Sequence, residues 1–262
     1  MPFTIATWNI NSLRLREGLV LDLLRQEAPD ILCLQECKSP VELMPREAAE
    51  ALGYRWFVAR GQKGYNGVAI FSRLPVSDAG GIDFAGTGHA RHVAATLENG
   101  VTIHNVYLPA GGDLPDPEAN PKFAQKLDFV AHLRDHFRAD APRRAILVGD
   151  LNIAPREDDV WNHKALLKIV SHTPVETDGL NEARDEGGWV DVTRADIPEG
   201  PLFSWWSYRS PDWDGADKGR RLDHVWASRD IAQAAHSSRI LRAARGWEKP
   251  SDHAPVFATF DL

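Results

Sequence analysis

Short aliphatic runs that end in polar residues recur along this chain of 262 residues. Residues 3–9 and 31–34 have this form, and leucine and valine repeat at helical spacing between them. The pattern predicts a strand, a helix capped by Asn11 or Ser12 that runs to about residue 27, and a second strand. The chain therefore begins as a strand–helix–strand unit with polar groups at both strand ends.

The pattern then becomes mostly that of strands. A helix over 42–52, closed by Gly53, precedes four runs bounded by glycine or proline turns. These runs predict strands at 54–59, 67–71, 92–97 and 101–108. The last two are joined by Glu98-Asn99-Gly100, a hairpin turn sequence. Residues 109–121 hold four prolines and two consecutive glycines, which predicts a long irregular loop of the kind that is often functional.

The second half of the chain alternates helical and extended patterns. Helices are expected over 121–138 and 155–170, and a mostly irregular segment over 171–201. Strands are expected at 146–149, 203–208, 222–227, 240–241 and 256–260. Strands that arrive both through hairpins and through helices predict an α/β fold with mixed sheets. No repeat or linker divides the sequence, so we expect a single domain over 1–262.

Composition narrows the setting. The formal charge of −7 argues against a strongly basic nucleic-acid surface, although acidic residues gathered around a cation would contribute to this charge. No run approaches the roughly 20 apolar residues of a membrane span, and residues 1–4 lack the start of a secretion signal. Cys33 and Cys37 lie about 13 Å apart in extended chain, too far for a disulfide. We expect a reduced, cytoplasmic protein with no membrane partner.

The polar residues at the strand ends are the candidates for chemistry. They are Asn9, Glu36, Tyr107, Asp150 with Asn152, Asp223, and Asp252 with His253. The run Ile146–Asn152 shows the pattern best, because Asp150 and Asn152 share one side of an extended chain just after Gly149. Gly-Asp-x-Asn is equally an ordinary Asx turn, and each of the other residues has a structural explanation when taken alone. Together, four carboxylates and a histidine at strand termini are costly to bury unless paired or bound to a metal.

Oxygen ligands without a cysteine set favour Mg²⁺, with Mn²⁺ as a substitute, over zinc. Metal, carboxylate and histidine together suit hydrolysis of a phosphate ester: the cation spreads developing charge, a carboxylate orients water, and imidazolium stabilises the pentavalent centre. The residues alone do not decide which group is the base.

Eight motifs resemble, in order, those of the exonuclease III family of abasic-site endonucleases, within the endonuclease/exonuclease/phosphatase superfamily. They are the segments 8–14 (WNINSLR), 34–38 (LQECK), 61–69 (GQKGYNGVA), 106–109 (VYLP), 149–154 (GDLNIA), 203–209 (FSWWSYR), 221–224 (RLDH) and 251–255 (SDHAP). The Gly-Asp-x-Asn and Ser-Asp-His motifs are shared with the wider superfamily, whereas the 61–69 and tryptophan-rich motifs are more specific. The resemblance implies a four-layered α/β sandwich of two packed mixed sheets, with the active site at one end.

The resemblance also implies roles for the site residues. Glu36 is similar to the main Mg²⁺ ligand, with Asp252 and Asn11 in the metal network. Asp150 resembles the residue that activates the attacking water, with Asn152 beside it. His253 resembles the histidine that contacts the scissile phosphate, and Asp223 the aspartate that orients it. Asn9 and Tyr107 resemble phosphate-site residues.

Substrate contacts follow from the same likeness. Trp205 and Leu222 are similar to residues that line the pocket for a flipped-out abasic sugar. Trp205 and Trp206 are adjacent on an expected strand, so one can face the site while the other packs inward. Basic residues between the motifs are candidates to grip flanking phosphates, although loop cations are usually just solvated. They are Lys63, Arg91, Arg209, Lys218, Arg220 and Arg221.

Two positions depart from the family pattern. After Tyr107-Leu108-Pro109 the family usually carries an asparagine or glutamine that reaches the phosphate, whereas this chain continues Ala110-Gly111-Gly112. The glycine N–H groups could substitute as a small anion nest. Asn11 stands where some relatives carry an aspartate. Both departures bear on the balance of activities.

The sequence thus predicts an Mg²⁺-dependent nuclease that cuts 5′ to abasic sites in double-stranded DNA, with 3′→5′ exonuclease and 3′-phosphatase activity at 3′ ends. We expect a monomer. One rival hypothesis is a superfamily enzyme acting on a small phosphoester, such as an inositol phosphate or a phospholipid head group. The other is a non-catalytic DNA-binding homologue.

Overall fold

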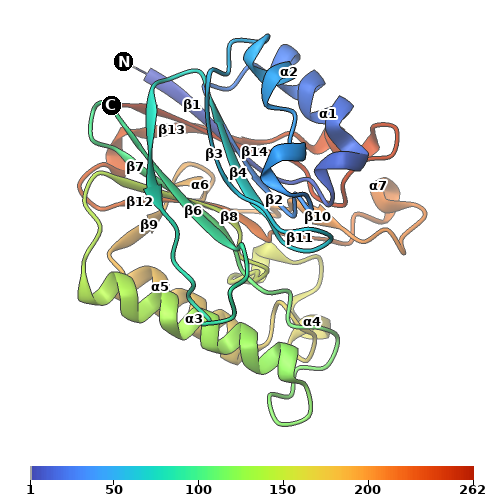
Figure 1. The fold of residues 1–262 in the computed structure, drawn as a ribbon. Coiled ribbons are helices and arrows are strands. Elements are labelled where there is room, and N and C mark those ends of the chain that lie inside the picture. Colours follow the sequence, from blue (N-terminus) through green and yellow to red (C-terminus); the bar gives the residue numbers. More distant parts are fainter. Residues whose placement is uncertain (1) are drawn as a thin grey trace.

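Two six-stranded mixed sheets pack face to face at the centre of the molecule (Figure 1). The computed structural model describes residues 2–262. Met1, which belongs to the expected domain and to the segment 1–4, lies outside the described residues. The first sheet has the order β13 (Ala235–Ile240), β14 (Val256–Asp261), β1 (Pro2–Asn9), β2 (Ile31–Gln35), β4 (Val68–Ser72), β3 (Trp56–Arg60). The second has the order β5 (Val76–Gly80), β6 (His92–Leu97), β7 (Thr102–Tyr107), β8 (Ala145–Asp150), β12 (Asp223–Ser228), β9 (Trp189–Asp191).

Each sheet has one parallel pair near its middle, flanked by antiparallel neighbours. In the first sheet β1 runs parallel to β2, and in the second β7 runs parallel to β8. Parallel strands need a crossover connection. The helices α1 (Leu13–Gln26) and α3 (Pro121–Ala139) supply it. A separate two-stranded ribbon is formed by β10 (Trp205–Trp206) and β11 (Gly219–Arg220).

The helices cover the outer faces of the two sheets. The α1 side chains of Val20, Leu23 and Leu24 pack against the first sheet, with α2 (Arg46–Glu50) beside α1. On the far side α3 and α5 (Pro174–Glu186) cover the second sheet (Figure 1). The remaining helices are short: α4 (His163–Leu166), α6 (Val192–Asp196), α7 (Trp213–Ala216), and the 3₁₀ helices η1 (Val41–Leu43), η2 (Glu157–Asp159), η3 (Ala232–Ala234) and η4 (Arg242–Gly246).

Three hydrophobic layers hold this arrangement together. Aliphatic side chains from both sheets, such as Ile5 and Ile146, fill the space between the sheets. A second layer joins the first sheet to α1, and a third joins the second sheet to α3 and α5 through Phe129 and Trp226. Alternate residues of each buried strand feed opposite layers, as the period of a strand requires. The expected four-layered α/β sandwich is confirmed.

Most of the expected elements are present, with corrections at two places. The helix expected over 155–170 is wrong, because only η2 and α4 form there. The irregular segment expected over 171–201 is also wrong, because it contains α5, β9 and α6. The start of α5 is set by Pro174 in the first turn and by a capping box between Thr173 and Glu176.

Smaller differences concern strand and helix ends. The helix expected over 42–52 is divided into η1 and α2 just before and after Pro45. The strand expected over 203–208 is reduced to the two residues of β10, and β5 was not expected. Ser12 precedes α1, but its side chain does not cap the helix. Cys33 and Cys37 are free and buried, as expected. None of the helices within residues 2–262 has the length and apolar content needed to cross a membrane.

Candidate active site

The polar strand ends meet at one end of the sandwich, opposite the chain termini. Asn9 ends β1, Tyr107 ends β7 and Asp150 ends β8, and these three strands point their C-terminal ends the same way. The antiparallel neighbours β12 and β14 begin at this end, so Asp223 and the segment before Val256 lie here as well. The two chain ends lie at the other end of the sheets (Figure 1). The polar residues that the sequence singled out therefore gather at one end of the sandwich, as expected.

The end of β8 is shaped by a glycine that no other residue could replace. Gly149 has φ +145°, and a Cβ placed there would lie 1.9 Å from the Val106 carbonyl oxygen of β7. The chain then turns through Asn152, whose N–H donates to Asp150 Oδ1 (2.9 Å). This bond is the Asx turn, and it leaves Asp150 Oδ2 free to accept from the Asn152 carboxamide (2.9 Å). Turn and site are thus the same structure.

Asn9 joins the two sheets across the site. Its Nδ2 donates to Glu36 Oε1 (2.9 Å) and to Asp150 Oδ2 (2.8 Å). Glu36 follows β2 in the first sheet and Asp150 ends β8 in the second, so one buried carboxamide fixes a carboxylate from each sheet. Glu36 and Asn152 both have positive φ, +50° and +51°. Non-glycine residues held in this region are commonly functional.

Asp223 and His253 form a buried pair. His253 Nδ1 lies 2.8 Å from Asp223 Oδ2, and its Nε2 lies 3.8 Å from Asp150 Oδ2. Burial alone would lower the pKa of His253, but the carboxylates of Asp223 and Asp150 outweigh it and raise the pKa to about 10. The imidazole is therefore an imidazolium at neutral pH, and its Nε2–H faces the same space as Asp150. The side-chain N and O atoms of Asp150, Asp223 and His253 all lie within 4.8 Å of one another, but the protonated imidazole of His253 has no lone pair to offer a metal ion.

Asp150 is the carboxylate with the most perturbed proton affinity of this group. It is 1% exposed, and burial raises its pKa to about 7, against the lowering effect of His253. A carboxylate with a pKa near neutrality can accept a proton at physiological pH and release it again. The environment of Asp150 therefore fits an acid–base role.

A cation position lies beside Glu36. Lys38 Nζ contacts Glu36 Oε2 (2.7 Å) and Asn11 Oδ1 (2.7 Å), so an ammonium group lies between two acceptor oxygens. Burial would raise the pKa of Glu36, but Lys38 and the bond from Asn9 hold it below its usual value. Asn11 in turn donates to Asp252 Oδ1 (3.1 Å). The oxygen groups of Glu36, Asn11 and Asp252 fit a hard cation.

Tyr107 lies against Arg91. The phenol is 7% exposed, and burial raises its pKa well above the usual value, helped by Glu36 and Asp150. The Arg91 guanidinium carbon lies 4.7 Å from the centre of the Tyr107 ring. Arg91 is thus a partly buried neighbour of Tyr107 rather than a residue of an open loop, and burial lowers its pKa. A phosphate role for Arg91 stays a prediction.

A cleft of about 960 Å³ opens onto these groups. Its lining includes Glu36, Asn152 and His253, together with Trp205 and Leu222. Trp205 is half-buried and donates from Nε1 to Asp252 Oδ2 (2.9 Å), whereas Trp206 is 1% exposed and packs inward. The expected division between the two tryptophans is therefore confirmed.

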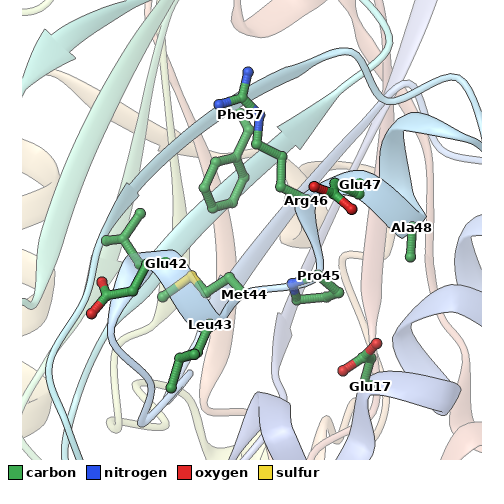
Figure 2. A pocket seen from close by; sticks show the side chains of 10 residues that line it. Glu17, Glu42, Leu43, Met44, Pro45, Arg46, Glu47, Ala48 and Phe57 are labelled. Carbon is green, nitrogen blue, oxygen red and sulfur yellow. The ribbon is translucent and has the colours of Figure 1, made fainter.

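A second hollow, of about 610 Å³, lies against α1, η1 and α2 (Figure 2). Its lining combines Met44 and Phe57 with acidic side chains such as Glu17 and Glu42. Figure 2 shows these acidic groups at its margin. None of the strand-end residues described above lines this hollow.

The basic candidates separate into two groups. Lys63, Arg209 and Lys218 are exposed, and the last two line the cleft, so these cations are available to a ligand. Arg220 also lines the cleft, but it is half-buried and already donates to Val170 and Ser171. The expectation that Arg221 grips a phosphate is wrong. Its side chain is 0% exposed, and it binds Asp159 (2.8 Å) and Asp191 (2.8 Å) inside the protein. Two buried carboxylates consume its donors, so it holds β12 in place instead.

The sequence analysis did not identify three residues that support the site. Ser204 donates to Asp223 Oδ2 (2.7 Å) and accepts the N–H groups of Leu222 and Asp223. Ser251 donates to the Asn9 carbonyl oxygen (2.6 Å). Lys38 is the third. All three lie within recognised motifs, but the bonding partners of a serine or a lysine depend on tertiary packing that local sequence does not reveal.

Comparisons with known proteins agree with this geometry. A model of the Endonuclease/Exonuclease/phosphatase family matches residues 6–253. Exodeoxyribonuclease III of Haemophilus influenzae is 32% identical, over 97% of this chain and 98% of that protein. The structure is similar to an AP endonuclease from Archaeoglobus fulgidus, with 30% identity, coverage of 99% of this chain and 100% of that one, and a TM-score of 0.91. It is also similar to a Neisseria 3′-phosphatase solved with a product DNA hairpin, with 35% identity, coverage of 99% and 100%, and a TM-score of 0.90.

Proposed function

The chain belongs to the endonuclease/exonuclease/phosphatase family and, within it, to the exonuclease III family, and we propose that it hydrolyses the phosphodiester 5′ to an abasic site in duplex DNA, leaving a 3′-hydroxyl. It is a hydrolytic, metal-dependent DNA repair nuclease. The observation that carries the proposal is the meeting of Asp150 with the Asp223–His253 pair, beside the Glu36 cation position.

The proposed mechanism assigns the proton transfer to Asp150. Its carboxylate accepts a proton from the attacking water, and the carboxamides of Asn9 and Asn152, which both donate to Oδ2, hold that carboxylate in position. His253 donates from Nε2 to the scissile phosphate, and its positive charge stabilises the extra negative charge of the pentavalent transition state. Asp223 keeps the imidazolium charged and aimed. The Tyr107 phenol stays protonated and serves as a donor to the phosphate.

The metal is assigned to the Glu36 side of the site. We propose Mg²⁺, with Mn²⁺ as a substitute, held by Glu36 and supported by Asn11 and Asp252. The proposal is supported by the ammonium group of Lys38, which contacts oxygen atoms of both Glu36 and Asn11. A bound divalent ion supplies charge neutralisation to the phosphate oxygens. Both Asp252 oxygens already accept bonds, from Asn11 and Trp205, so Asp252 acts mainly by orienting those side chains.

Substrate selection is assigned to the cleft wall. An abasic nucleotide has no pairing to lose, so its extrusion from the duplex is the least costly. Trp205 and Leu222 offer apolar surface without base-reading groups, which suits a bare sugar. Lys63 and Arg209 are free to contact flanking phosphates. We propose 3′→5′ exonuclease and 3′-phosphatase activity at the same site, because each reaction attacks a phosphoester at the same position relative to His253.

The glycine departure has a structural counterpart. Gly111 and Gly112 both have positive φ, +88° and +72°, and Gly112 lines the cleft while Gly111 is turned inward. Gly111's carbonyl oxygen accepts from Asn120 (2.9 Å). The N–H of Gly112 is the donor we assign to the phosphate in place of the usual side chain.

We propose that the protein works as a monomer, as one domain over 1–262, in the cytoplasm. Cys33 and Cys37 are free, which suits a reducing compartment.

A duplex with one tetrahydrofuran abasic analogue tests the function. With Mg²⁺ present, we expect a single cut 5′ to the analogue and a 3′-hydroxyl end. A 3′-recessed undamaged duplex run beside it measures the exonuclease. An intact abasic strand would contradict the proposal. Turnover of an inositol phosphate with no DNA cleavage would favour the small-phosphoester alternative, and tight duplex binding without any turnover would favour the non-catalytic one.

A further inference from the structure

A fully buried ion pair lies beneath the loops that follow β7 and β8, which carry Ala110 and Asn152 and are called the catalytic loops below. The pair takes no part in the mechanism above. Lys126 of α3 and Glu176 of α5 are both 0% exposed, and Lys126 Nζ contacts Glu176 Oε1 at 2.5 Å. Burial lowers the pKa of Lys126, and Glu176 opposes this effect. Removing two charges from water costs several kcal/mol for each ion, and apolar replacements for such a pair are often neutral or stabilising. A contribution to the free energy of unfolding therefore does not explain why this pair is buried here.

The other contacts of Lys126 lead to the reacting groups. Its Nζ donates to the carbonyl oxygen of Asn152 (2.8 Å) and to that of Ala110 (3.3 Å). Asn152 follows β8 and Ala110 follows β7, so one ammonium group holds the loops at the ends of the parallel pair. Gly111 packs so closely that a Cβ there would lie 2.8 Å from Lys126 Cδ.

Asn152 needs such an anchor. Its backbone has φ +51°, a conformation that is costly for a residue other than glycine and persists only when its surroundings enforce it. Its side chain is fixed by Leu108 O (2.9 Å) and Asp150 Oδ2 (2.9 Å). Within residues 2–262, Lys126 is the one donor that makes a hydrogen bond to the Asn152 carbonyl oxygen. Release of this carbonyl lets the peptide rotate, and the carboxamide beside Asp150 moves with it.

Glu176 extends the same anchor to the cleft wall. Its carboxylate accepts from the N–H of Ser171 (2.9 Å) and from the hydroxyl of Thr173 (2.7 Å). Ser171 has φ +87° and lines the cleft. Its hydroxyl accepts from Arg220 (2.6 Å), whose guanidinium lies over the Trp205 ring at 5.3 Å from the centroid. The pair thus joins the catalytic loops to the wall that carries Trp205.

We propose that Lys126 is a positioning residue for the hydrolysis: it holds the Asn152 backbone so that the Asn152 carboxamide keeps Asp150 aimed at the attacking water. Glu176 neutralises Lys126 and, through its bond from the Ser171 N–H, holds this part of the cleft lining in place relative to the same loops. The inference rests on the proposed function of this site and deepens it. A displacement of about 1 Å at a reacting group can cost about 10²-fold in rate.

The test uses variants that leave no unpaired buried charge. Lys126→Met/Glu176→Gln removes both charges and keeps the approximate volume. We expect the single-turnover cleavage rate on the tetrahydrofuran duplex to fall about 10²-fold, while the Kd for that duplex, measured in EDTA, changes less than about threefold. Should this variant not fold, Lys126→Gln/Glu176→Gln also removes both charges and keeps a hydrogen-bond donor at position 126.

Arg194→Met provides the matched control. Arg194 is also a buried cation with one acidic partner, Asp159 (2.6 Å), and two carbonyl partners, Ile197 and Gly200, but it touches neither catalytic loop. We expect a lower Tm with an unchanged single-turnover rate. An equal rate loss in Arg194→Met would mean that the loss follows stability, and it would overturn the positioning role.

Coupling to Asn152 gives the sharpest outcome. If Lys126 acts through Asn152, adding Lys126→Met/Glu176→Gln to Asn152→Ala lowers the rate by less than about threefold beyond Asn152→Ala alone. Fully multiplicative losses would contradict action through Asn152, as would an unchanged rate in Lys126→Met/Glu176→Gln. Cleavage by the unaltered protein in the same assay reports separately on the proposed function, so failure of one claim is distinguishable from failure of the other.

Discussion

Asn9 shows how individual residues make this site work. A single carboxamide nitrogen bonds a carboxylate of each sheet, Glu36 at 2.9 Å and Asp150 at 2.8 Å. The two carboxylates have opposite environments: Lys38 and hydrogen bonds keep the pKa of Glu36 low in spite of its burial, whereas burial raises that of Asp150 to about 7. Neighbouring titratable groups whose pKa values are pushed apart are a mark of divided roles. We assign the cation to Glu36 and the proton to Asp150.

This division predicts a pH profile. The Asp150 carboxylate is present above its pKa and is lost as pH falls through it, so kcat/KM on the abasic duplex should fall on the acid side, with a limb at or below about pH 7. A bound cation moves the limb only downward. His253 has a pKa of about 10, so no loss from its deprotonation is expected below about pH 9. Rates from pH 5 to 9 check this, and a kcat/KM that falls between pH 7 and 8.5 would refute the assignment.

At the scale of elements, the ribbon of β10 and β11 forms one wall of the cleft. Trp205 packs with Leu222, Ala154 and Val160 in a small apolar cluster that is separate from the main core. Asp252 fixes the indole from one side, and Arg220 lies over its ring. The side chain is thus held in place although it is not part of the core, as a substrate pocket requires.

Trp205→Ala should therefore change selectivity more than chemistry. We expect cleavage at the abasic analogue to fall by about tenfold or more, because apolar contact with the extruded sugar is lost. Hydrolysis of a 3′-phosphate on a duplex end, which needs no extruded nucleotide, should fall much less. The ratio of the two rates measures the effect. Trp161→Ala, at another half-exposed tryptophan of the cleft, is the control. Equal losses in both reactions would show that Trp205 acts on the catalytic groups.

The elements also show how far the sequence could be interpreted. Strands with continuous aliphatic runs, such as 146–149, were predicted nearly to the residue, because burial on both faces leaves an unambiguous pattern. The segment 155–201 was wrong, because α5 is held mainly by its capping box and by Leu180 and Ala183, too few apolar positions to show a period. The start of that helix could have been found from Thr173-Pro174-Val175-Glu176.

The site followed the same rule. Residues that end strands could be predicted because position alone brings them together, as for Asp150, Asp223 and His253. The role of Arg221 could not be predicted, because the sequence around an arginine that binds phosphate looks the same as the sequence around an arginine in a buried ion pair. Its partners Asp159 and Asp191 are 62 and 30 positions away along the chain, and only the fold brings them together.

At the scale of the whole molecule, two sheets with similar central parallel pairs each supply part of the site. The layers that hold the sheets together include buried polar groups, and one of these is sensitive to acid. The Ile82 N–H donates to His92 Nδ1 (2.9 Å), and His92 Nε2 lies 3.1 Å from His104 Nδ1 on a stacked ring. Both rings are therefore neutral. Burial lowers the pKa of His92 well below its usual value and that of His104 to about 4.

The sign of the resulting effect follows from linkage. The unfolded chain binds these protons near pH 6.5, whereas the folded chain binds the His104 proton only near pH 4 and holds the pKa of His92 well below its usual value. The free energy of unfolding should therefore decrease as pH falls from about 6.5 towards 4. Asp150, with its raised pKa, acts in the opposite direction over part of the same range. The measurement is therefore a difference: urea unfolding at pH 7.5 and 5.0 for the unaltered protein and for His104→Gln. The variant should show the weaker loss on acidification, and equal slopes would contradict the account.

The central claim is that Asp150 acts on the nucleophile while Glu36 holds the cation, and one comparison tests it directly. Asp150→Asn and Glu36→Ala are each titrated with Mn²⁺, with abasic duplex in EDTA, and then assayed in single turnover across a range of Mg²⁺ concentrations. We predict that Asp150→Asn binds metal and DNA nearly as the unaltered protein does but cleaves about 10²–10⁴-fold more slowly at every Mg²⁺ concentration. Glu36→Ala should bind Mn²⁺ weakly and regain part of its rate as Mg²⁺ rises. Equal losses of metal binding in both variants, with neither rate restored by Mg²⁺, would contradict the division of roles.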